Sequence, residues 1–323
     1  MKQTTFASAA WEKKGKVTRR ERFLAEMDQV IPWASILSLI EPHYPKAGNG
    51  TQPMPMERML RIYFMQQWFN LSDPAMEDAL YDSESMRRFA GIELIEDAVP
   101  DESTILRFRH LLEQHQLTQK LFELVRGLLE QKRLLLKSGT IVDATIIDAP
   151  PSTKNESKSR DPQMKHGKKN SREWRFGMKA HVGTDLNGLV HTLVTTHAAA
   201  SDLGQLPKLL HGQERELYGD QAYWSELHRI AAKEHGVRYR VNRRPANQDR
   251  PLSEYQRRLN RLRSATRARG EHAFHVVKTL WGFTKVRYRG LAKNTARLFA
   301  AFALANLYMV RRQLMPPQGA CRC

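Results

Sequence analysis

The stretch GTIVDATIIDAP, residues 139–150, marks the point at which the chain changes from helix to strand. Its β-branched and apolar residues predict a strand with Asp143 in the middle. Before it, residues 21–135 carry apolar side chains at helical spacing, and after it strands and helices alternate. We therefore expect an all-α N-terminal domain followed by an α/β domain with a mixed sheet.

Further elements of this sheet are predicted downstream. Residues 174–197 are typical of a hairpin, because Asn187–Gly188 is a strong turn signal. Two more strands are expected, RELYGD ending at Asp220 and VRYRV at 237–241. The helices expected here are one from about Asp202, one near Trp224, a long basic helix from Tyr255 to Trp281, and an apolar helix at 295–312.

The helical part divides at residues 42–50 and at Pro100. After Pro100, DESTILRFRHLLEQHQL has capping residues ahead of a helix that carries Arg107 and Arg109. A run of helices of this kind suits a module that contacts DNA, although helical bundles that only pack are also common.

Charge narrows the class of partner. The 323 residues include 52 Lys and Arg against 34 Asp and Glu, a net charge of +18. Such an excess indicates a polyanion, most often nucleic acid, and less often an anionic membrane surface. The apolar run at 298–310 contains Asn306 and is too short to span a bilayer. Since the N-terminus lacks the apolar stretch of a signal peptide, a cytoplasmic location is expected.

Two further segments are distinctive in composition. Residues 151–175 form a Lys-, Ser- and Asn-rich insert, which predicts either a solvated loop or a DNA-binding arm. The last residues, 316–323, contain the only two cysteines, Cys321 and Cys323. Two cysteines are too few for a disulfide framework or a zinc site, so this tail is expected to be disordered.

Three acidic residues stand out as candidate metal ligands. Asp143 lies among β-branched residues, where a carboxylate is costly unless it is paired or binds a metal. Asp220 ends a predicted strand, and Glu271 is the single acidic residue among fifteen Lys and Arg from Tyr255 to Cys323. Carboxylates on three separate elements can converge to hold two divalent cations, which supports phosphoryl transfer.

The neighbours of Glu271 fit a site for DNA phosphates. Arg267 precedes it by four residues and Lys278 follows it by seven. On a regular helix the three side chains share one face, so the cations could hold phosphate oxygens beside a metal ligand. A simple Arg–Glu ion pair, four residues apart, is the alternative.

Taken together, IVDATIIDAP, YGDQAY and the spacing Arg267, Glu271, Lys278 resemble the three blocks of bacterial DDE transposases. The similarity is strongest to the insertion sequence five family and covers nearly the whole chain, including PKAGNG, NLSDPAMEDALYD, APPSTKN, FGMKAH and GLAKN. The resemblance implies a ribonuclease H-like catalytic domain with a five-stranded mixed sheet. It also implies a catalytic, metal-binding triad of Asp143, Asp220 and Glu271, with the first two acids on adjacent strands.

The same resemblance implies the function and the partners. A transposase would bind the terminal inverted repeats of an insertion sequence, cleave to free 3′-OH ends and join them to target DNA. Two Mg²⁺ ions would serve the chemistry, with Mn²⁺ as a substitute, and Arg267 and Lys278 would bind phosphate. A homodimer on paired ends, acting at the bacterial nucleoid and not at a membrane, is expected. One departure is Ser264, which stands where related transposases have a tyrosine, so no role of that tyrosine is carried over.

The expected domains are a helical DNA-binding domain at 1–135, a catalytic domain at 136–315 with the insert 151–175, and the tail 316–323. Two other functions remain open: a metal-dependent endonuclease that cleaves without joining, and a non-catalytic DNA-binding protein derived from a transposase.

A few residues compete for these roles. Asp148 is a rival first acid, but it falls on the opposite strand face from Asp143. Asp202 fits a helix N-cap better than a metal ligand. Trp281 could stack on an unpaired base, although an aromatic residue ending a helix is more often core.

Overall fold

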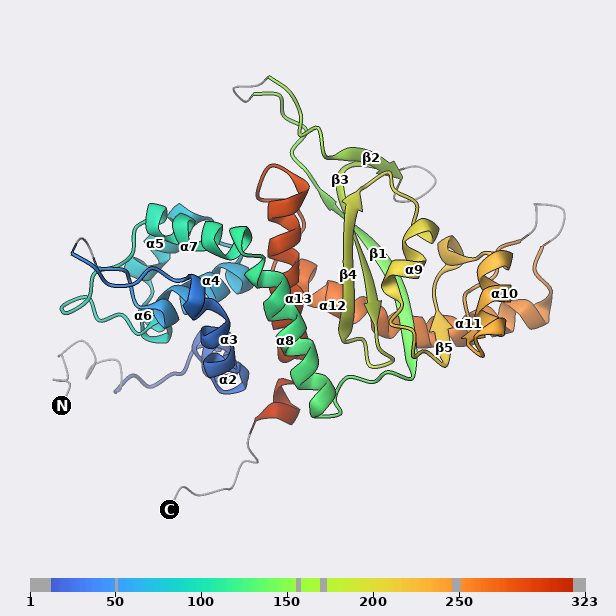
Figure 1. The fold of residues 1–323 in the computed structure, drawn as a ribbon, viewed down its shortest axis with the longest axis horizontal. Coiled ribbons are helices and arrows are strands. Elements are labelled where there is room, and N and C mark those ends of the chain that lie inside the picture. The colour runs from blue at the N-terminus through green and yellow to red at the C-terminus, as the bar shows by residue number, and fades with distance from the viewer. Residues whose placement is uncertain (1–12, 50–51, 155–157, 169–172, 246–250, 316–323) are drawn as a thin grey trace, which may run out of the picture.

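The computed structural model describes residues 13–49, 52–154, 158–168, 173–245 and 251–315. The predicted tail with Cys321 and Cys323 lies outside them. In Figure 1 the N-terminal helices lie on one side, the sheet on the other, and helix α13 (Leu291–Leu314) runs between them.

The N-terminal part is helical throughout its described length, as predicted. Its elements are α2 (Arg19–Val30), α3 (Trp33–Ile40), η1 (Glu41–His43), α4 (Met56–Phe69), α5 (Asp73–Asp82), α6 (Glu84–Ala90), α7 (Glu102–Gln114) and α8 (Leu117–Gln131). The predicted capping ahead of α7 is confirmed, because the Asp101 side chain accepts a hydrogen bond from the Thr104 amide. No single helix among the described residues has the length and apolarity to cross a membrane, and only the bent pair Arg19–Val30 and Trp33–His43 meets that test jointly.

The sheet is mixed, as predicted. Its strands are β1 (Gly139–Asp148), β2 (Lys165–Lys168), β3 (Trp174–Thr184), β4 (Val190–His197), β5 (Glu216–Tyr218) and β6 (Arg238–Tyr239). β1 is central, with β3 antiparallel on one side and β5 parallel on the other, and β6 follows β5. The order β4-β3-β1-β5-β6 is the five-stranded ribonuclease H-like sheet, and β2 is an addition to it.

That additional strand comes from the insert 151–175. β2 pairs with the first residues of β3, beyond the part of β3 that pairs with β4. Near Asp161 the insert is also tied to the start of α13, since the Asp161 carboxylate accepts from the Gly290 amide at 2.6 Å. The described part of the insert is therefore partly structured rather than a plain loop.

Helices cover both faces of the sheet. One face, with Met178, Ala180 and Val182, packs in the main core with α12 (Glu271–Phe274) and α13. The other face packs Val142 with a smaller core that includes Leu206 and Leu217. Leu206 belongs to α9 (Leu206–Leu209), and in Figure 1 α9 and α10 (Glu226–Glu234) lie on the same side of β1.

Helix α13 is shared by the two parts of the chain. Its buried residues join the main core with those of α2, α4 and α8 as well as with β3 and β4. Asn306 accepts from the Val190 amide and donates to the Val190 carbonyl, while Arg311 donates to Glu26 of α2. The N-terminal helices thus have no core separate from the C-terminal helix.

The predicted helix from Tyr255 to Trp281 is present as an unbroken helical segment over residues 254–280, but it is not a regular α-helix. The segment divides into α11 (Glu254–Arg267), a 3₁₀ turn η4 (Ala268–Gly270), α12, and a π-helical turn η5 (His275–Leu280). The regular spacing that would put Arg267, Glu271 and Lys278 on one face therefore does not apply. Irregular turns of this kind inside helices often occur at functional sites.

Candidate active site

Asp143 and Asp220 come from neighbouring parallel strands. Ile141 of β1 pairs in register with Tyr218 of β5, and the two acids lie two residues further along each backbone. β5 ends at Tyr218, not at Asp220 as predicted, and Asp220 instead caps the turn η3 (Gln221–Tyr223) by accepting from the Ala222 amide at 2.8 Å. Both carboxylates thus project at the same edge of the sheet.

Glu271 is brought to this edge by the turn η4. Gly270, directly before it, is buried against β1: a Cβ atom on this glycine would lie 2.9 Å from Ile141 Cγ2. The hairpin turn supports η4 from the other side, because Arg269 donates to the Leu186 carbonyl at 3.2 Å. Gly188, with a φ of +89°, also leaves room there for the Arg269 carbonyl.

Burial and like charge disfavour the ionised form of Asp143. Burial, the larger cause, together with the nearby charges of Asp220 and Glu271, raises the pKa of Asp143 to about 7. The Ala144 amide and the Arg267 guanidinium oppose this increase. Asp220 and Glu271 are therefore each close enough to Asp143 to disfavour its charge, and an added cation would relieve this repulsion.

Arg267 links two of these acids. Its Nη1 atom lies 3.7 Å from Asp143 Oδ2, and its Nη2 atom lies 3.1 Å from Glu271 Oε1. The ion pair between residues 267 and 271, anticipated as the alternative to a phosphate site, is present. The Arg267 guanidinium has more N–H donors than these two contacts use. These contacts therefore do not conflict with a role of Arg267 in binding phosphate.

Lys278 points to β1. Its Nζ atom donates to Thr145 Oγ1 at 2.9 Å and to the Ile146 carbonyl at 2.8 Å. The lysine therefore ties η5 to the strand that carries Asp143, two residues from that acid.

Two family descriptions match the chain. Residues 12–111 match "Transposase domain (DUF772)", and residues 135–307 match "Transposase DDE domain". The chain belongs to the DDE transposases. Among solved structures, "Crystal structure of the Mos1 Strand Transfer Complex" is similar at 14% identity, over 83% of this chain and 79% of that chain. Its TM-score of 0.27 is too low to define the fold by itself.

Membership of this family implies a divalent metal ion, and the donor chemistry of the transposase fits one. The three carboxylates supply oxygen ligands only, which Mg²⁺ and Mn²⁺ favour, and the repulsion around half-buried Asp143 is what a cation would relieve. In the described part of the chain, however, no group of three or more His, Cys, Asp or Glu side chains is close enough to hold an ion. The transposase would have to draw its carboxylates together to bind metal.

The other candidate residues have separate roles. Asp148 pairs with Arg175 at 2.7 Å, on the far side of β1. Asp202 stands at the N-cap position of η2 (Leu203–Gln205), as predicted, but its carboxylate makes no capping bond and instead accepts from Lys179 Nζ at 2.8 Å. Trp281 is 5% exposed and contacts Tyr308, so it belongs to the core and cannot stack on a base.

Sequence reasoning missed the residues that position the transposase site. Gly270 gave no signal beyond being a glycine within a helical pattern, which can mark a close backbone approach. Ser264 was noted only as a departure from the family, yet its hydroxyl accepts from Asn242 at 2.9 Å and joins α11 to the end of β6. Of the two arginines noted on the helix after Pro100, Arg109 is 6% exposed and bridges Asp73 and Glu113, both at 3.0 Å, so it packs inside the protein.

Proposed function

We propose that this transposase binds the terminal inverted repeats of an insertion sequence, cleaves to free 3′-OH ends and joins those ends to target DNA. Asp143, Asp220 and Glu271 would be its catalytic carboxylates. The observation that carries the proposal is geometric: β1 and β5 pair in register just before Asp143 and Asp220, and Arg267 contacts both Asp143 and Glu271. Clustered acids with a perturbed pKa at a sheet edge are typical of a functional site.

Two divalent cations, with Mg²⁺ preferred and Mn²⁺ as a substitute, would be held by these acids. When bound, such ions lower the pKa of the attacking hydroxyl or water and stabilise the leaving oxygen. The remaining work falls to this chain's own residues. Asp143 and Asp220 are fixed by amide hydrogen bonds from Ala144 and Ala222, so each presents a defined oxygen to the site.

Cations beside the acids would hold the scissile strand. Arg267 and Lys278 both end near β1, where a phosphate bound to the carboxylate edge would lie. Either could stabilise charge that develops on phosphate oxygens in the transition state. For Arg267 this requires a shift from its present contacts towards the DNA.

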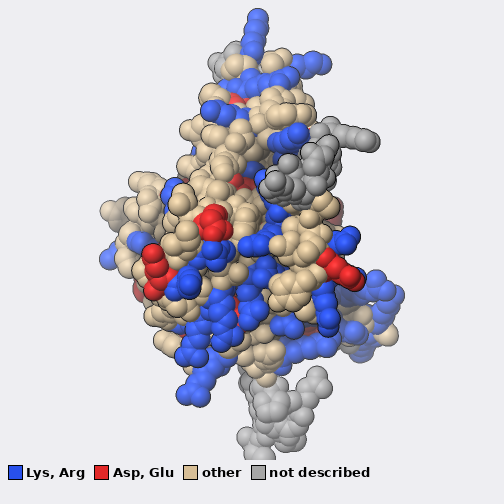
Figure 2. Space-filling view, turned by 90° about the vertical axis from the view of Figure 1, so that its right-hand side faces the viewer, with Lys and Arg blue, Asp and Glu red and all other residues tan. Residues whose placement is uncertain are grey.

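The wider DNA contact would use the basic surface. Figure 2 looks at the end of the molecule that carries α10 and α11 and shows Lys and Arg gathered over this face, with few Asp and Glu. Exposed lysines of the insert, among them Lys154, Lys158 and Lys165, would add to it as an arm. Residues 1–135 would recognise the end sequence, residues 136–315 would act on it, and two copies would hold two ends.

Incubation with DNA bearing the element's ends, in Mg²⁺, tests this proposal when both cuts and joints are mapped. We expect cuts that leave 3′-OH groups at the element boundary and joined products with target DNA. Cuts without joints would indicate an endonuclease, and specific binding without either would indicate a non-catalytic protein.

A further inference from the structure

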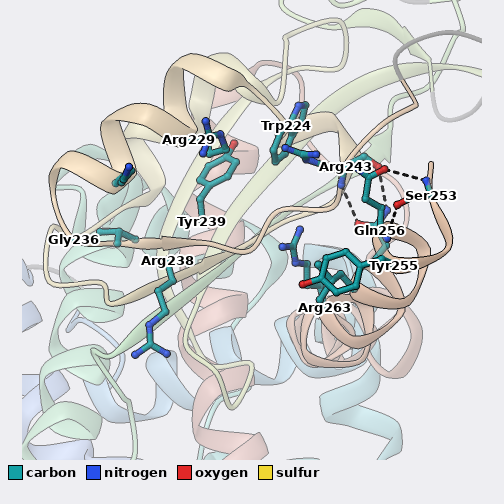
Figure 3. A pocket seen from close by; sticks show the side chains of 14 residues that line it. Trp224, Arg229, Gly236, Arg238, Tyr239, Arg243, Ser253, Tyr255, Gln256 and Arg263 are labelled. Carbon is teal, nitrogen blue, oxygen red and sulfur yellow. Dashed lines mark hydrogen bonds between the residues drawn. The ribbon is translucent and has the colours of Figure 1, made fainter. Parts of the chain in front are cut away.

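A second pocket lies apart from the carboxylates, between α10, β6 and α11. Its volume is about 650 Å³, within the range that small-molecule sites occupy. Figure 3 shows its side chains converging from the three elements, with Trp224, Tyr239 and Arg243 on one wall and Tyr255 and Arg263 on α11.

The charge of this pocket is one-sided. Among the residues that the structure describes, its lining contains five cations and no acidic residue: Arg229, Lys233, Arg238, Arg243 and Arg263. Arg229 and Arg238 have carboxylate partners outside the lining, Glu226 and Glu216. Within the described residues, no salt bridge is formed by Lys233, Arg243 or Arg263. The pocket therefore favours an anion.

Aromatic rings make the pocket more specific than a phosphate site. The Trp224 and Tyr239 rings lie 5.6 Å apart, and the Arg243 guanidinium lies 5.1 Å from the centre of the Trp224 ring. Tyr255 is 71% exposed at the start of α11, a large apolar surface that nothing in the described chain covers. Flat rings next to guanidinium groups suit a planar ligand that also carries negative charge.

The walls of the pocket are fixed before any ligand binds. Asn260 of α11 donates to the Arg243 carbonyl and accepts from the Arg243 amide, both at 3.1 Å. Arg263 donates to the Val241 carbonyl at 2.9 Å. The Tyr239 hydroxyl donates to the Tyr223 carbonyl at 2.6 Å, which holds the segment bearing Trp224. Preorganised walls reduce the entropic cost of binding.

The pocket shares its supporting elements with the candidate active site. Trp224 follows Asp220 by four residues across η3, and Arg263 precedes Arg267 by one turn of α11. A DNA strand held at the carboxylates would therefore pass near the pocket mouth. The passage of a DNA strand near the pocket rests on the proposed function, whereas the charge and the aromatic lining of the pocket do not.

We propose that this pocket binds one unpaired nucleotide of a DNA strand, with its base against Trp224 and Tyr255 and its phosphate on Arg243 and Arg263. A fully paired base could not enter, because its faces are covered by its neighbours in the stack. A free nucleotide carries the same base and phosphate, so the experiment must distinguish a nucleotide within DNA from a free nucleotide.

The test compares three probes in chelator, where no cleavage interferes. They are a duplex with a single-nucleotide 2-aminopurine bulge, the same duplex fully paired, and the free 2-aminopurine nucleoside 5′-monophosphate. We expect the bulged duplex to bind about tenfold more tightly than the paired one. Trp224→Ala and Tyr255→Ala should remove that preference and leave binding of the paired duplex unchanged.

Two arginine variants separate the pocket from general charge. Arg243→Ala should reduce the preference for the bulge, whereas Arg258→Ala, an exposed arginine of α11 outside the lining, should keep it. Equal binding of bulged and paired duplexes by the wild type would overturn the proposal. A preference for the bulged duplex that persists in Tyr255→Ala would also overturn it. Because the Tyr255 side chain is exposed, misfolding of this variant could not explain such a result. Tight binding of the free monophosphate, without a preference for the bulged duplex, would contradict the claim that the bound nucleotide belongs to DNA. These outcomes do not depend on cleavage.

Discussion

Gly270 lies so close to Ile141 that a Cβ atom on it would be 2.9 Å from the isoleucine Cγ2 atom. The contact joins the turn before Glu271 to the strand that carries Asp143 two residues later. Ile141 is fully buried, so it has little freedom to move aside. The separation between the two candidate metal ligands therefore depends on the absence of a side chain at residue 270.

Gly270→Ala should consequently weaken the site. We expect the free energy of unfolding to fall by about 1–3 kcal/mol, as for overpacked cores, and cleavage to slow further as Glu271 shifts. The control is Gly127→Ala in α8, where a Cβ would meet nothing within 4 Å. This control should be neutral or stabilise by about 0.5–1 kcal/mol. Urea unfolding and single-turnover cleavage measure both effects, and equal behaviour of the two variants would contradict the account.

The pKa of Asp143 makes stability depend on pH. Its folded value of about 7 exceeds the ordinary 3.8, so the folded state holds this proton more firmly than the unfolded state. That contribution is complete below about pH 4 and is lost as the pH rises through about 7. At about 1.4 kcal/mol per pKa unit, the loss approaches about 4 kcal/mol.

Asp143→Asn removes this titration and keeps the oxygen that accepts from Ala144. In chelator, the stability of the variant relative to the wild type should therefore increase from pH 4 to pH 8. Denaturant unfolding across this range measures the difference. A difference that does not change with pH would mean that Asp143 ionises as freely in the folded protein as in the unfolded chain.

Arg267 and Lys278 should differ in what they stabilise. Replacing either by Ala should lower the slope of log K against log salt for DNA binding by about one and slow cleavage. Only Lys278→Ala should also reduce the free energy of unfolding, by about 1–2 kcal/mol, because it loses two hydrogen bonds to β1. Arg267→Lys should reduce activity more than Lys278→Arg, because the planar guanidinium can bind a phosphate in a bidentate manner and an ammonium group cannot.

Arg261→Ala, on an exposed side of α11, is the matched control for charge. Salt titration of end binding, unfolding curves and single-turnover cleavage together separate these roles. Unchanged salt slopes and cleavage for Arg267→Ala and Lys278→Ala would leave both side chains with structural contacts only.

Divalent metal should be required for activity and should also stabilise the protein. We expect cleavage in Mg²⁺ or Mn²⁺, none in chelator, and binding without chemistry in Ca²⁺. Because a metal that binds the folded state raises its stability, the melting temperature should rise with Mn²⁺ concentration. Asp220→Asn should reduce this rise. Full cleavage in chelator would exclude metal-dependent chemistry.

The sequence predicted the sheet because its signals are local. The β-branched run around Asp143, the Asn187–Gly188 turn and the cap at Asp101 each act within a few residues, and each is present as expected. The failures depend on contacts between distant segments. The 3₁₀ turn in the predicted long helix lies where Gly270 packs against Ile141, and the carboxylate of Asp202 accepts from Lys179, twenty-three residues away, instead of making a capping bond.

The same limit applies to the candidate site. Asp143, Asp220, Glu271 and the Arg267–Glu271 pair could be selected from residue type, spacing and motif, but the contact of Arg267 with Asp143 on a distant strand could not. Nor does local pattern reveal the pocket around Trp224, whose walls come from three elements joined by Asn260 and Arg263. Hydrophobic spacing identifies elements, whereas pockets depend on how those elements pack.

The central claim is that Asp143, Asp220 and Glu271 act together in phosphoryl transfer. It is tested most directly by single-turnover cleavage of end DNA in saturating Mg²⁺ by the three alanine variants, with DNA affinity measured separately in chelator. Glu254→Ala, which removes an exposed acid from the first turn of α11, is the matched control. The account predicts no detectable cleavage by the three variants, near-normal DNA affinity for all, and normal cleavage by the control. Cleavage by Glu271→Ala at the rate of Glu254→Ala would contradict it.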